Sequence, residues 1–258
     1  MLAIDAIPAF EDNYIWCISN PDNNCAFVVD PGDAKPVIDY LKANALTLSG
    51  ILITHHHPDH TGGISTLKQA YDCEVFGPES SKITGIDKPL SESDTIECLG
   101  HSCHVFEIPG HTLDHIAYFF DRDNDTPRLF CGDTLFAGGC GRIFEGTPAQ
   151  MLSSLKKLAI LPLETEVYCA HEYTQVNLHF ALTVEPDNSA LQQRCQDIDK
   201  LRSNGTSTLP SSLALELSTN PFLRCQHSDL LATAKRYNPN AETELDVFTA
   251  IRTLKNNF

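Results

Sequence analysis

Residues 51–60 of this chain read Ile51-Leu52-Ile53-Thr54-His55-His56-His57-Pro58-Asp59-His60. The segment is an apolar strand that runs directly into a loop of histidine and aspartate. Extended backbone alternates its side chains, so His55 and His57 are predicted to point the same way, while Pro58 disfavours helix at His57. Asp59 and His60 follow at the start of the next predicted helix and can address a second point nearby. One short loop therefore offers two pairs of metal ligands.

Further ligand candidates share one local context, because each directly follows a predicted strand and is preceded by a small residue. They are His111 in Pro109-Gly110-His111-Thr112, Asp133 in Cys131-Gly132-Asp133-Thr134 and His171 in Cys169-Ala170-His171-Glu172. Glycine or alanine before the ligand lets the backbone approach closely. The recurrence of this context, together with the H-x-H-x-D-H cluster, indicates one metal centre rather than unrelated polar residues at strand ends.

The ligand types suit two neighbouring ions, because neutral imidazole and carboxylate bind zinc, with iron and manganese as alternatives. We expect two divalent metal ions per chain, the first held by His55, His57 and His111, the second by Asp59, His60 and His171, with Asp133 bridging both. Two ions roughly 3.5–4 Å apart can share a water and lower its pKa from about 15.7 toward about 7. The set predicts a hydrolase that uses this hydroxide, with Asp59 and Asp133 as catalytic groups and without a separate Ser or Cys nucleophile.

Short apolar runs separated by turns dominate the first 170 residues. They predict strands over 14–19, 25–30, 50–54, 73–76, 104–108, 116–120, 129–132 and 166–170. Helical spacing appears at 36–43 and 64–71, and Thr147-Pro148-Ala149-Gln150 is predicted to cap a helix over 151–161. After His171 the strand alternation stops, and 188–202 and 242–255 have amphipathic helical spacing. We expect a catalytic domain at 1–172 and a small helical domain at 173–258.

Composition restricts the class of protein and of ligand. With 258 residues and 42% hydrophobic content the chain can bury a sizeable core. No run approaches the roughly 18 apolar residues of a membrane helix, and the N-terminus lacks the pattern of a signal peptide, so we expect a cytoplasmic protein without membrane association. The net charge of -16 disfavours nucleic acid as a partner and requires a local group of cations for any anionic substrate. Ten cysteines without a C-x-x-C pair are expected to be reduced and mostly buried.

The segment 54–60, Pro109–Thr112, Gly132–Thr134 and His171 resemble the metallo-β-lactamase superfamily. The resemblance implies an α/β fold, the αββα sandwich, with metals at one edge of the sheets. Further motifs, spread over the whole chain, resemble the hydroxyacylglutathione hydrolase (glyoxalase II) family. They are Asp12-Asn13-Tyr14, Gly139-Cys140-Gly141-Arg142, Phe144-Glu145-Gly146, His171-Glu172-Tyr173-Thr174, Asn177-Leu178, Val184-Glu185-Pro186, Asn220-Pro221-Phe222 and Arg252-x-x-Lys255.

That resemblance implies a small-molecule glutathione thioester as substrate. S-D-lactoylglutathione and other S-2-hydroxyacylglutathiones would be hydrolysed to glutathione and D-lactate or another 2-hydroxy acid, the second step of methylglyoxal detoxification. The implied substrate-binding residues are Arg142, Ile143, Phe144, Tyr173, Arg252 and Lys255. The positive charges among them provide the local cations that an anionic substrate requires in this acidic chain, because glutathione carries carboxylates. Two positions depart from the family, which often has Tyr at Phe144 and Gly at Asp114.

Several alternatives stay open at this point. The chain could be another enzyme of the fold, such as a glutathione persulfide dioxygenase, or a non-catalytic binding protein; the complete ligand set argues against both. A surface ion pair is the alternative role for Arg142, a helix-dipole contact for Arg252 and Lys255, and core packing for Tyr173. His56, His115 and Asp30 are candidates for orienting the ligands. We expect a monomer.

Overall fold

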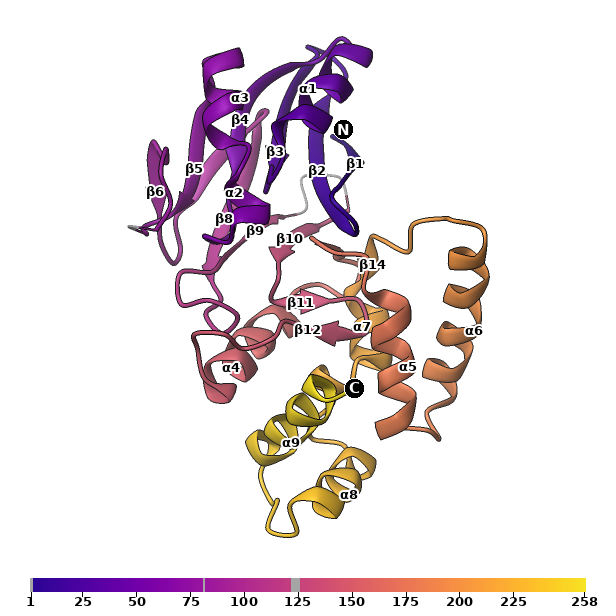
Figure 1. The fold of residues 1–258 in the computed structure, drawn as a ribbon. Coiled ribbons are helices and arrows are strands. Elements are labelled where there is room, and N and C mark those ends of the chain that lie inside the picture. Colours follow the sequence, from indigo (N-terminus) through magenta and orange to yellow (C-terminus); the bar gives the residue numbers. More distant parts are fainter. Residues whose placement is uncertain (1, 81, 122–125) are drawn as a thin grey trace. The chain divides into compact units, whose positions relative to one another are not determined.

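The computed structural model describes residues 2–80, 82–121 and 126–258. Internal packing divides the chain into two units (Figure 1). The first comprises Met1–Glu107 and Asp114–Gly132, and the second comprises Ile108–Leu113 and Asp133–Phe258.

One sheet of the first unit has the strand order β1-β2-β3-β4-β5-β6. Its strands are β1 (Ala3–Ala9), β2 (Asn13–Asn20), β3 (Cys25–Val29), β4 (Thr47–Leu52), β5 (Glu74–Pro78) and β6 (Lys88–Leu90). The first three pair antiparallel, and β3 to β6 pair in parallel. Parallel pairing requires crossover connections, and helices supply two of them.

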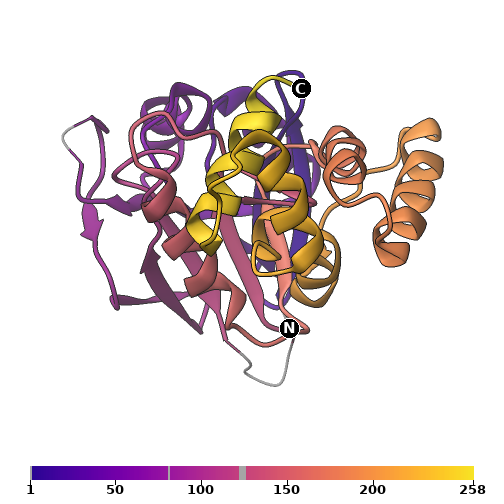
Figure 2. The same cartoon turned by 90° about the horizontal axis from the view of Figure 1, so that it is seen from below.

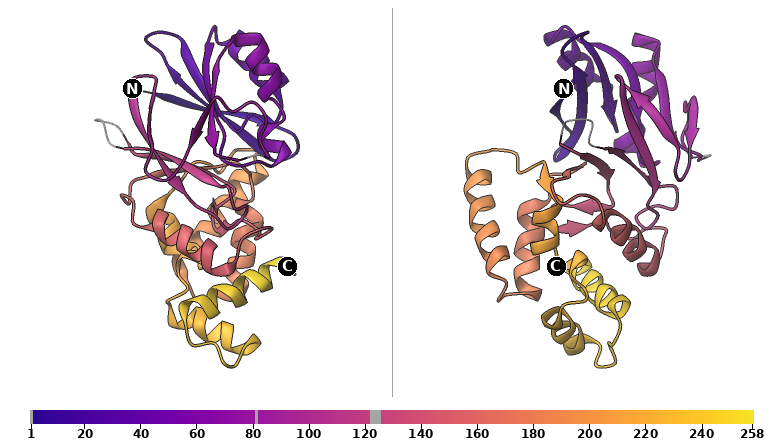
Figure 3. Two further views of the ribbon diagram at one scale, coloured as in Figure 1. Left: turned by 90° about the vertical axis from the view of Figure 1, so that its left-hand side faces the viewer. Right: turned by 180° about the vertical axis from the view of Figure 1, so that it is seen from behind.

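Two helices, α1 (Ala34–Ala43) and α3 (Ile64–Tyr71), lie against one face of this sheet (Figures 1 and 3). The apolar positions of both helices pack with alternate residues of the strands in one buried cluster, which includes Val37, Leu41, Ile51, Ile53 and Leu67. Both helices begin and end within two residues of the bounds predicted from their amphipathic spacing. The spacing is informative because burial of one apolar face supplies most of a helix's stability.

A second set of strands in this unit faces the other side of the sheet. They are β7 (Thr95–Cys98), β8 (His101–Glu107), β9 (Ile116–Phe120) and β10 (Arg128–Gly132), all antiparallel. The Tyr118 hydroxyl of β9 donates to the Ile53 carbonyl at 2.8 Å and approaches that of Phe76 at 3.3 Å. Complete burial raises the pKa of Tyr118 well above its ordinary value, so the phenol stays protonated and keeps this donor between the two sheets.

The second unit contains short strands and most of the helices. Its elements are β11 (Leu135–Phe136), β12 (Gly139–Cys140), α4 (Pro148–Ala159), β13 (Glu166–Cys169), α5 (Thr174–Val184), α6 (Ser189–Ser203), β14 (Ser211–Ser212), α7 (Leu213–Thr219), η1 (Pro221–Leu223), α8 (Ser228–Tyr237) and α9 (Glu244–Asn256). Within it α5 packs beside α6, and α8 beside α9 (Figure 2).

Local signals in the sequence set the ends of several elements. The predicted cap of α4 is confirmed, since the Thr147 side chain accepts from the Gln150 amide at 3.2 Å and the Gln150 side chain accepts from the Thr147 amide at 2.9 Å. All the predicted strands and helices have counterparts within a few residues. The sequence reasoning made no prediction for β1, β6, β7, α5, α7 and α8, nor for the very short elements β11, β12, β14 and η1. Strand β1 mixes partly exposed residues with a proline, and so lacks clear alternation.

The cysteines are all free, and every one except the partly exposed Cys25 is buried. That burial agrees with their expected role as small apolar residues. Among the described residues, no helix combines the length and apolar character that crossing a lipid bilayer demands.

Candidate functional site

The predicted ligands fall into two groups, one in each unit. In the first unit, β4 leads into the loop that carries His55 and His57, and the short helix α2 (Pro58–Thr61) carries Asp59 and His60. His57 has the extended conformation expected before proline, with φ −62° and ψ 145°. His55 Nε2 and His57 Nδ1 lie 3.0 Å apart, and His60 Nε2 and Asp59 Oδ2 lie 3.4 Å apart. The side chains of each predicted pair within this loop therefore lie close together.

The tautomer of His55 follows from its hydrogen bonds. The Thr54 hydroxyl donates its one proton to Asp30 Oδ2 at 2.7 Å, so its oxygen must accept from His55 Nδ1, which lies 3.0 Å away. A neutral ring with a proton on Nδ1 has its lone pair on Nε2, the atom that faces His57. Asp30 also accepts from the Thr54 amide at 2.7 Å and lies 3.0 Å from His60 Nδ1. Asp30 thus lies where it can orient the predicted ligands His55, through Thr54, and His60.

Gly132 packs closely against Thr54 of this loop and against the His115 ring. Its φ of +47° is a conformation that favours glycine, and a Cβ there would lie 2.4 Å from Thr54 Oγ1 and 2.9 Å from His115. The His115 ring stacks on His55 with centroids 4.5 Å apart, and its Nδ1 donates to the Ile116 carbonyl at 3.0 Å. The glycine before Asp133 is therefore required by packing against Thr54 and His115.

His56 points to a different partner from its neighbours in the loop. Its Nδ1 lies 2.9 Å and 3.0 Å from the two oxygens of Asp114, and both side chains are largely buried. This contact gives the carboxylate of Asp114 a partner within the same unit. Asn13, a residue of one family motif with no role assigned from the sequence, donates to Asp59 Oδ2 at 3.0 Å and helps to fix that ligand.

In the second unit, Asp133 lies between two histidines. Its Oδ2 is 3.3 Å from His111 Nε2 and its Oδ1 is 3.4 Å from His171 Nε2, and the three residues are buried. His111 Nδ1 lies 2.7 Å from the Arg142 carbonyl, which can only accept. The proton of His111 is therefore on Nδ1, and its Nε2 lone pair faces Asp133.

The spacing of these donor atoms suits metal ligands. Bonds of about 2.0–2.2 Å from one tetrahedral ion to nitrogen and oxygen place neighbouring ligand atoms roughly 3.4 Å apart. The contacts of Asp133 with His111 and His171 are close to that value, and each carboxylate oxygen faces a different imidazole. Such an arrangement fits a carboxylate that serves two ions. The histidine and aspartate clusters of both units can thus hold divalent metal ions.

Several of the predicted substrate residues lie beside the ligands of the second unit. The Phe144 ring is 61% exposed and its centroid lies 5.3 Å from that of His111, while the Arg142 guanidinium lies 5.9 Å from the Phe144 ring. Ile143, which lies between them in the sequence, is partly exposed. Tyr173 stacks on His171 with centroids 4.8 Å apart and an interplanar angle of 7°. The exposed Phe144 ring therefore lies next to the predicted ligand His111, with the Arg142 cation near it. The Tyr173 ring covers the predicted ligand His171.

The two cations of the C-terminal helix differ in their surroundings. Arg252 is buried, donates to the Cys140 carbonyl at 2.7 Å, and lies 5.1 Å from the Phe222 ring. Lys255 is half-buried against Phe180 and Phe258. Burial, followed by repulsion from Arg252, lowers the pKa of Lys255 to about 8. Arg252 therefore holds the backbone just before Arg142, and Lys255 is a cation whose charge changes near neutral pH.

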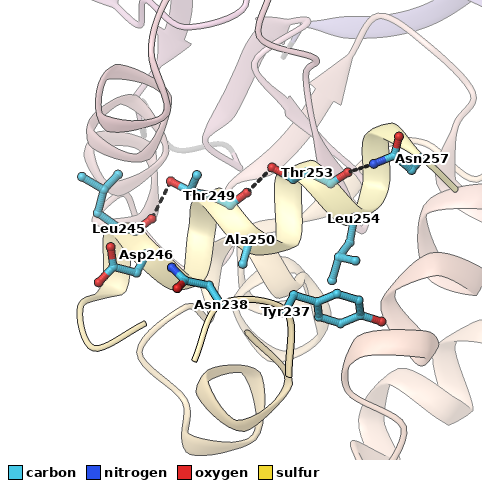
Figure 4. A pocket seen from close by; sticks show the side chains of 9 residues that line it. All are labelled: Tyr237, Asn238, Leu245, Asp246, Thr249, Ala250, Thr253, Leu254 and Asn257. Carbon is cyan, nitrogen blue, oxygen red and sulfur yellow. Dashed lines mark hydrogen bonds between the residues drawn. The ribbon is translucent and has the colours of Figure 1, made fainter. Parts of the chain in front are cut away.

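A groove of about 610 Å³ lies between α8 and α9 (Figure 4). Tyr237, Leu245, Ala250 and Leu254 supply much of its apolar lining. Along α9 the side chains of Thr249, Thr253 and Asn257 bond to backbone carbonyls one turn earlier, which leaves mainly apolar atoms facing the groove. None of the predicted substrate residues is among its lining residues.

Comparisons with known proteins agree with the ligand pattern. The model of the metallo-beta-lactamase superfamily matches residues 12–171, and the model of the hydroxyacylglutathione hydrolase C-terminus matches residues 172–258. The chain is 52% identical to a hydroxyacylglutathione hydrolase of Photobacterium profundum and 51% identical to one of Pseudomonas aeruginosa, in both cases over the full length of both chains. Among solved structures, ETHE1 from Myxococcus xanthus is similar with a TM-score of 0.66 at 22% identity, covering 99% of this chain and 98% of that one.

These findings confirm the expected fold, a metallo-β-lactamase sandwich with a helical C-terminal region. They do not favour the alternatives of another enzyme of the fold or a non-catalytic binding protein. The chain is a member of the hydroxyacylglutathione hydrolase family within the metallo-β-lactamase superfamily.

Proposed function

We propose that this chain hydrolyses S-D-lactoylglutathione and other S-2-hydroxyacylglutathiones to glutathione and the free 2-hydroxy acid, with D-lactate as the product of the first. The observation that carries the proposal is about 50% identity, over the whole of both chains, to proteins named hydroxyacylglutathione hydrolase. The reaction would be the second step of methylglyoxal detoxification. We further propose a catalytic domain at 1–172, a substrate-binding domain at 173–258, and a monomeric cytoplasmic enzyme without nucleic-acid or membrane partners.

The proposed cofactors are two divalent ions, with zinc preferred and iron or manganese as alternatives. His55, His57 and His111 would hold one, Asp59, His60 and His171 the other, and Asp133 both. Bound ions of this kind lower the pKa of a water toward about 7 and polarise a carbonyl. The histidine tautomers support this assignment, because His55 and His111 each have a hydrogen-bonded Nδ1, which puts the lone pair of the neutral ring on Nε2.

The chain's own groups would then bind and orient the thioester. Arg142, Arg252 and Lys255 supply positive charge for the glutathione carboxylates in an otherwise acidic protein. The exposed Phe144 ring and Ile143 offer apolar contact beside His111, and Tyr173 covers His171. Tyrosine is common at position 144 in the family, so its hydroxyl contact with substrate is absent here. Asp59, held by Asn13, is the catalytic carboxylate of the first unit.

The assignment is tested by an assay on protein whose metals have been counted. We expect S-D-lactoylglutathione to be hydrolysed by the metal-loaded chain, and activity to fall to background after chelation and to return when zinc, iron or manganese is restored. Glutathione release and metal content are measured on the same samples. Full turnover by the metal-stripped chain would reject the two-metal mechanism, and a loaded chain that leaves the thioester intact would reject the substrate.

The lowered pKa of Lys255 predicts that KM for the thioester depends on pH. A lysine with a pKa of about 8 is charged below that pH and neutral above it. If its charge holds a glutathione carboxylate, KM for S-D-lactoylglutathione should rise roughly tenfold between about pH 7 and about pH 9, since one charge-assisted hydrogen bond contributes about 1.5 kcal/mol. The measurement is KM against pH, corrected for uncatalysed hydrolysis.

Two comparisons isolate the lysine in that measurement. Lys255→Arg should keep KM flat over the same range, because the guanidinium stays charged. A small thioester without carboxylates should show no rise in KM with the original chain. An equal rise for both substrates, or a rise that survives Lys255→Arg, would contradict a role for Lys255 in glutathione binding.

A further inference from the structure

A second group of side chains with the chemistry of metal ligands occurs on the paired helices α5 and α6, and it shares no residue with the ligands assigned above. His179 lies on α5, and Cys195 and Asp199 lie one turn apart on α6. Residues four apart share a face of a helix, so the thiol and the carboxylate both face α5. One donor atom from each of the three residues lies within 4.8 Å of the other two.

The separation of the donors fits an ion. His179 Nε2 and Asp199 Oδ1 are 3.1 Å apart, and two ligand atoms on one tetrahedral zinc-like ion lie roughly 3.4 Å apart. A thiolate bond of about 2.3 Å places its sulfur slightly farther from the other ligands. Only small side-chain movements are therefore needed for nitrogen, oxygen and sulfur to share one ion, and water can take the fourth position.

The surroundings hold these residues in place and leave a path for an ion. Gln175, one turn before His179, donates to Asp199 Oδ1 at 2.8 Å and fixes that carboxylate. Cys195 is buried with Leu178, Ala181 and Leu191 in the apolar contact between the helices. The His179 and Asp199 side chains remain 44% and 45% exposed, so the cluster opens to solvent on one side. In Figures 1 and 3 the two helices lie side by side along their length.

The chemistry of the three donors selects the class of ion. Thiolate and imidazole prefer borderline or soft divalent ions such as Zn²⁺ and Cd²⁺, whereas Mg²⁺ and Ca²⁺ take oxygen ligands. Burial raises the pKa of the Cys195 thiol, and the Asp199 carboxylate raises it further. A bound cation would offset both effects, because it favours the thiolate over the thiol.

We propose that His179, Cys195 and Asp199 form an additional divalent-metal site that joins α5 to α6. It would take zinc or an ion of similar softness, with solvent completing the coordination. An ion there would cross-link two helices that are already joined by apolar packing and by the contacts of Asp199 with Gln175 and His179. It would thereby stabilise the helical region without entering the reaction. The site is independent of the proposed function, because it uses none of the ligands assigned to the catalytic ions.

Cadmium binding to the zinc-loaded enzyme provides a direct test. The seven catalytic ligands contain no sulfur, so a thiolate-to-cadmium charge-transfer band in the ultraviolet reports only on cysteine. We expect a band that saturates at about one Cd²⁺ per chain, with thermal unfolding shifted to higher temperature as Cd²⁺ or Zn²⁺ is raised. Cys195→Ser should abolish the band, whereas Cys25→Ser, which removes the one partly exposed cysteine, should leave it unchanged.

Exposed ligands provide variants that do not disturb the core. His179→Gln and Asp199→Asn should each weaken Cd²⁺ binding at least tenfold, while thioester hydrolysis by the zinc-loaded enzyme stays at its original rate. A band that persists in Cys195→Ser would overturn the proposal. So would unchanged Cd²⁺ affinity in both His179→Gln and Asp199→Asn, since the thiol would then bind alone. Loss of hydrolysis with metal binding at this cluster intact would count only against the proposed function.

Discussion

Asp133→Ala should reduce thioester hydrolysis by about a thousandfold or more and should lower the bound metal toward one ion or none per chain. The reason is its position, with one carboxylate oxygen facing His111 Nε2 at 3.3 Å and the other facing His171 Nε2 at 3.4 Å. Metal activation contributes several kcal/mol to such reactions, and each 1.36 kcal/mol is a factor of ten in rate. The measurements are metal content and kcat on the same preparation.

A matched exposed carboxylate separates this effect from a general loss of charge. Asp229 lies in the first turn of α8, exposed to solvent. Asp229→Ala should leave metal content and kcat at their original values, with at most a small loss of helix stability from the dipole. Asp133→Asn should behave nearly as Asp133→Ala, because an amide is a poor ligand for two ions. Two full equivalents of metal in the alanine variant would show that Asp133 is not a shared ligand.

Glu216→Ala should destabilise the folded chain by about 3–5 kcal/mol, since it removes one partner of a buried ion pair. Glu216 of α7 is fully buried and accepts from Arg194 Nη2 at 2.5 Å, from the Gly138 amide at 2.8 Å and from Asn220 Nδ2 at 3.0 Å. The Ser211 hydroxyl is a further donor. The substitution would leave a buried guanidinium and several donors without their acceptor, which equilibrium unfolding in urea measures.

The same substitution should also affect the predicted substrate loop. Asn220 donates to the Phe136 carbonyl at 3.1 Å and to the Gly139 carbonyl at 2.9 Å, shortly before Arg142. We therefore expect KM to rise along with the loss of stability. Asp197→Ala, which removes an exposed partner of Lys200, is the control and should change neither quantity measurably. If both variants lowered stability equally, the buried network would not have the importance assigned to it.

Much of the fold could be predicted because its signals are local. Buried strands such as β9 and β10 read as continuous apolar runs, and α4 begins at a capping motif of four residues. The missed β1 shows the limit of that approach. Most of its side chains are exposed or only partly buried, and it is a strand because it pairs along its whole length with β2. Pairing between strands is a tertiary property that period-two alternation reveals only when one face is buried.

The sequence by itself determined which residues are ligand candidates and how they pair within a loop. Spacing of two along extended backbone brings His55 and His57 together, and proline at 58 keeps them so. Only the tertiary structure decided the ring tautomers, the pairing of His56 with Asp114, and the use of Arg252 to hold the Cys140 carbonyl. Each of these depends on a hydrogen bond between residues that are 24 to 112 positions apart along the chain, as in the bonds from Thr54 to Asp30 and from Arg252 to Cys140. Contacts over such separations depend on how strands and helices pack, and local spacing carries no information about them.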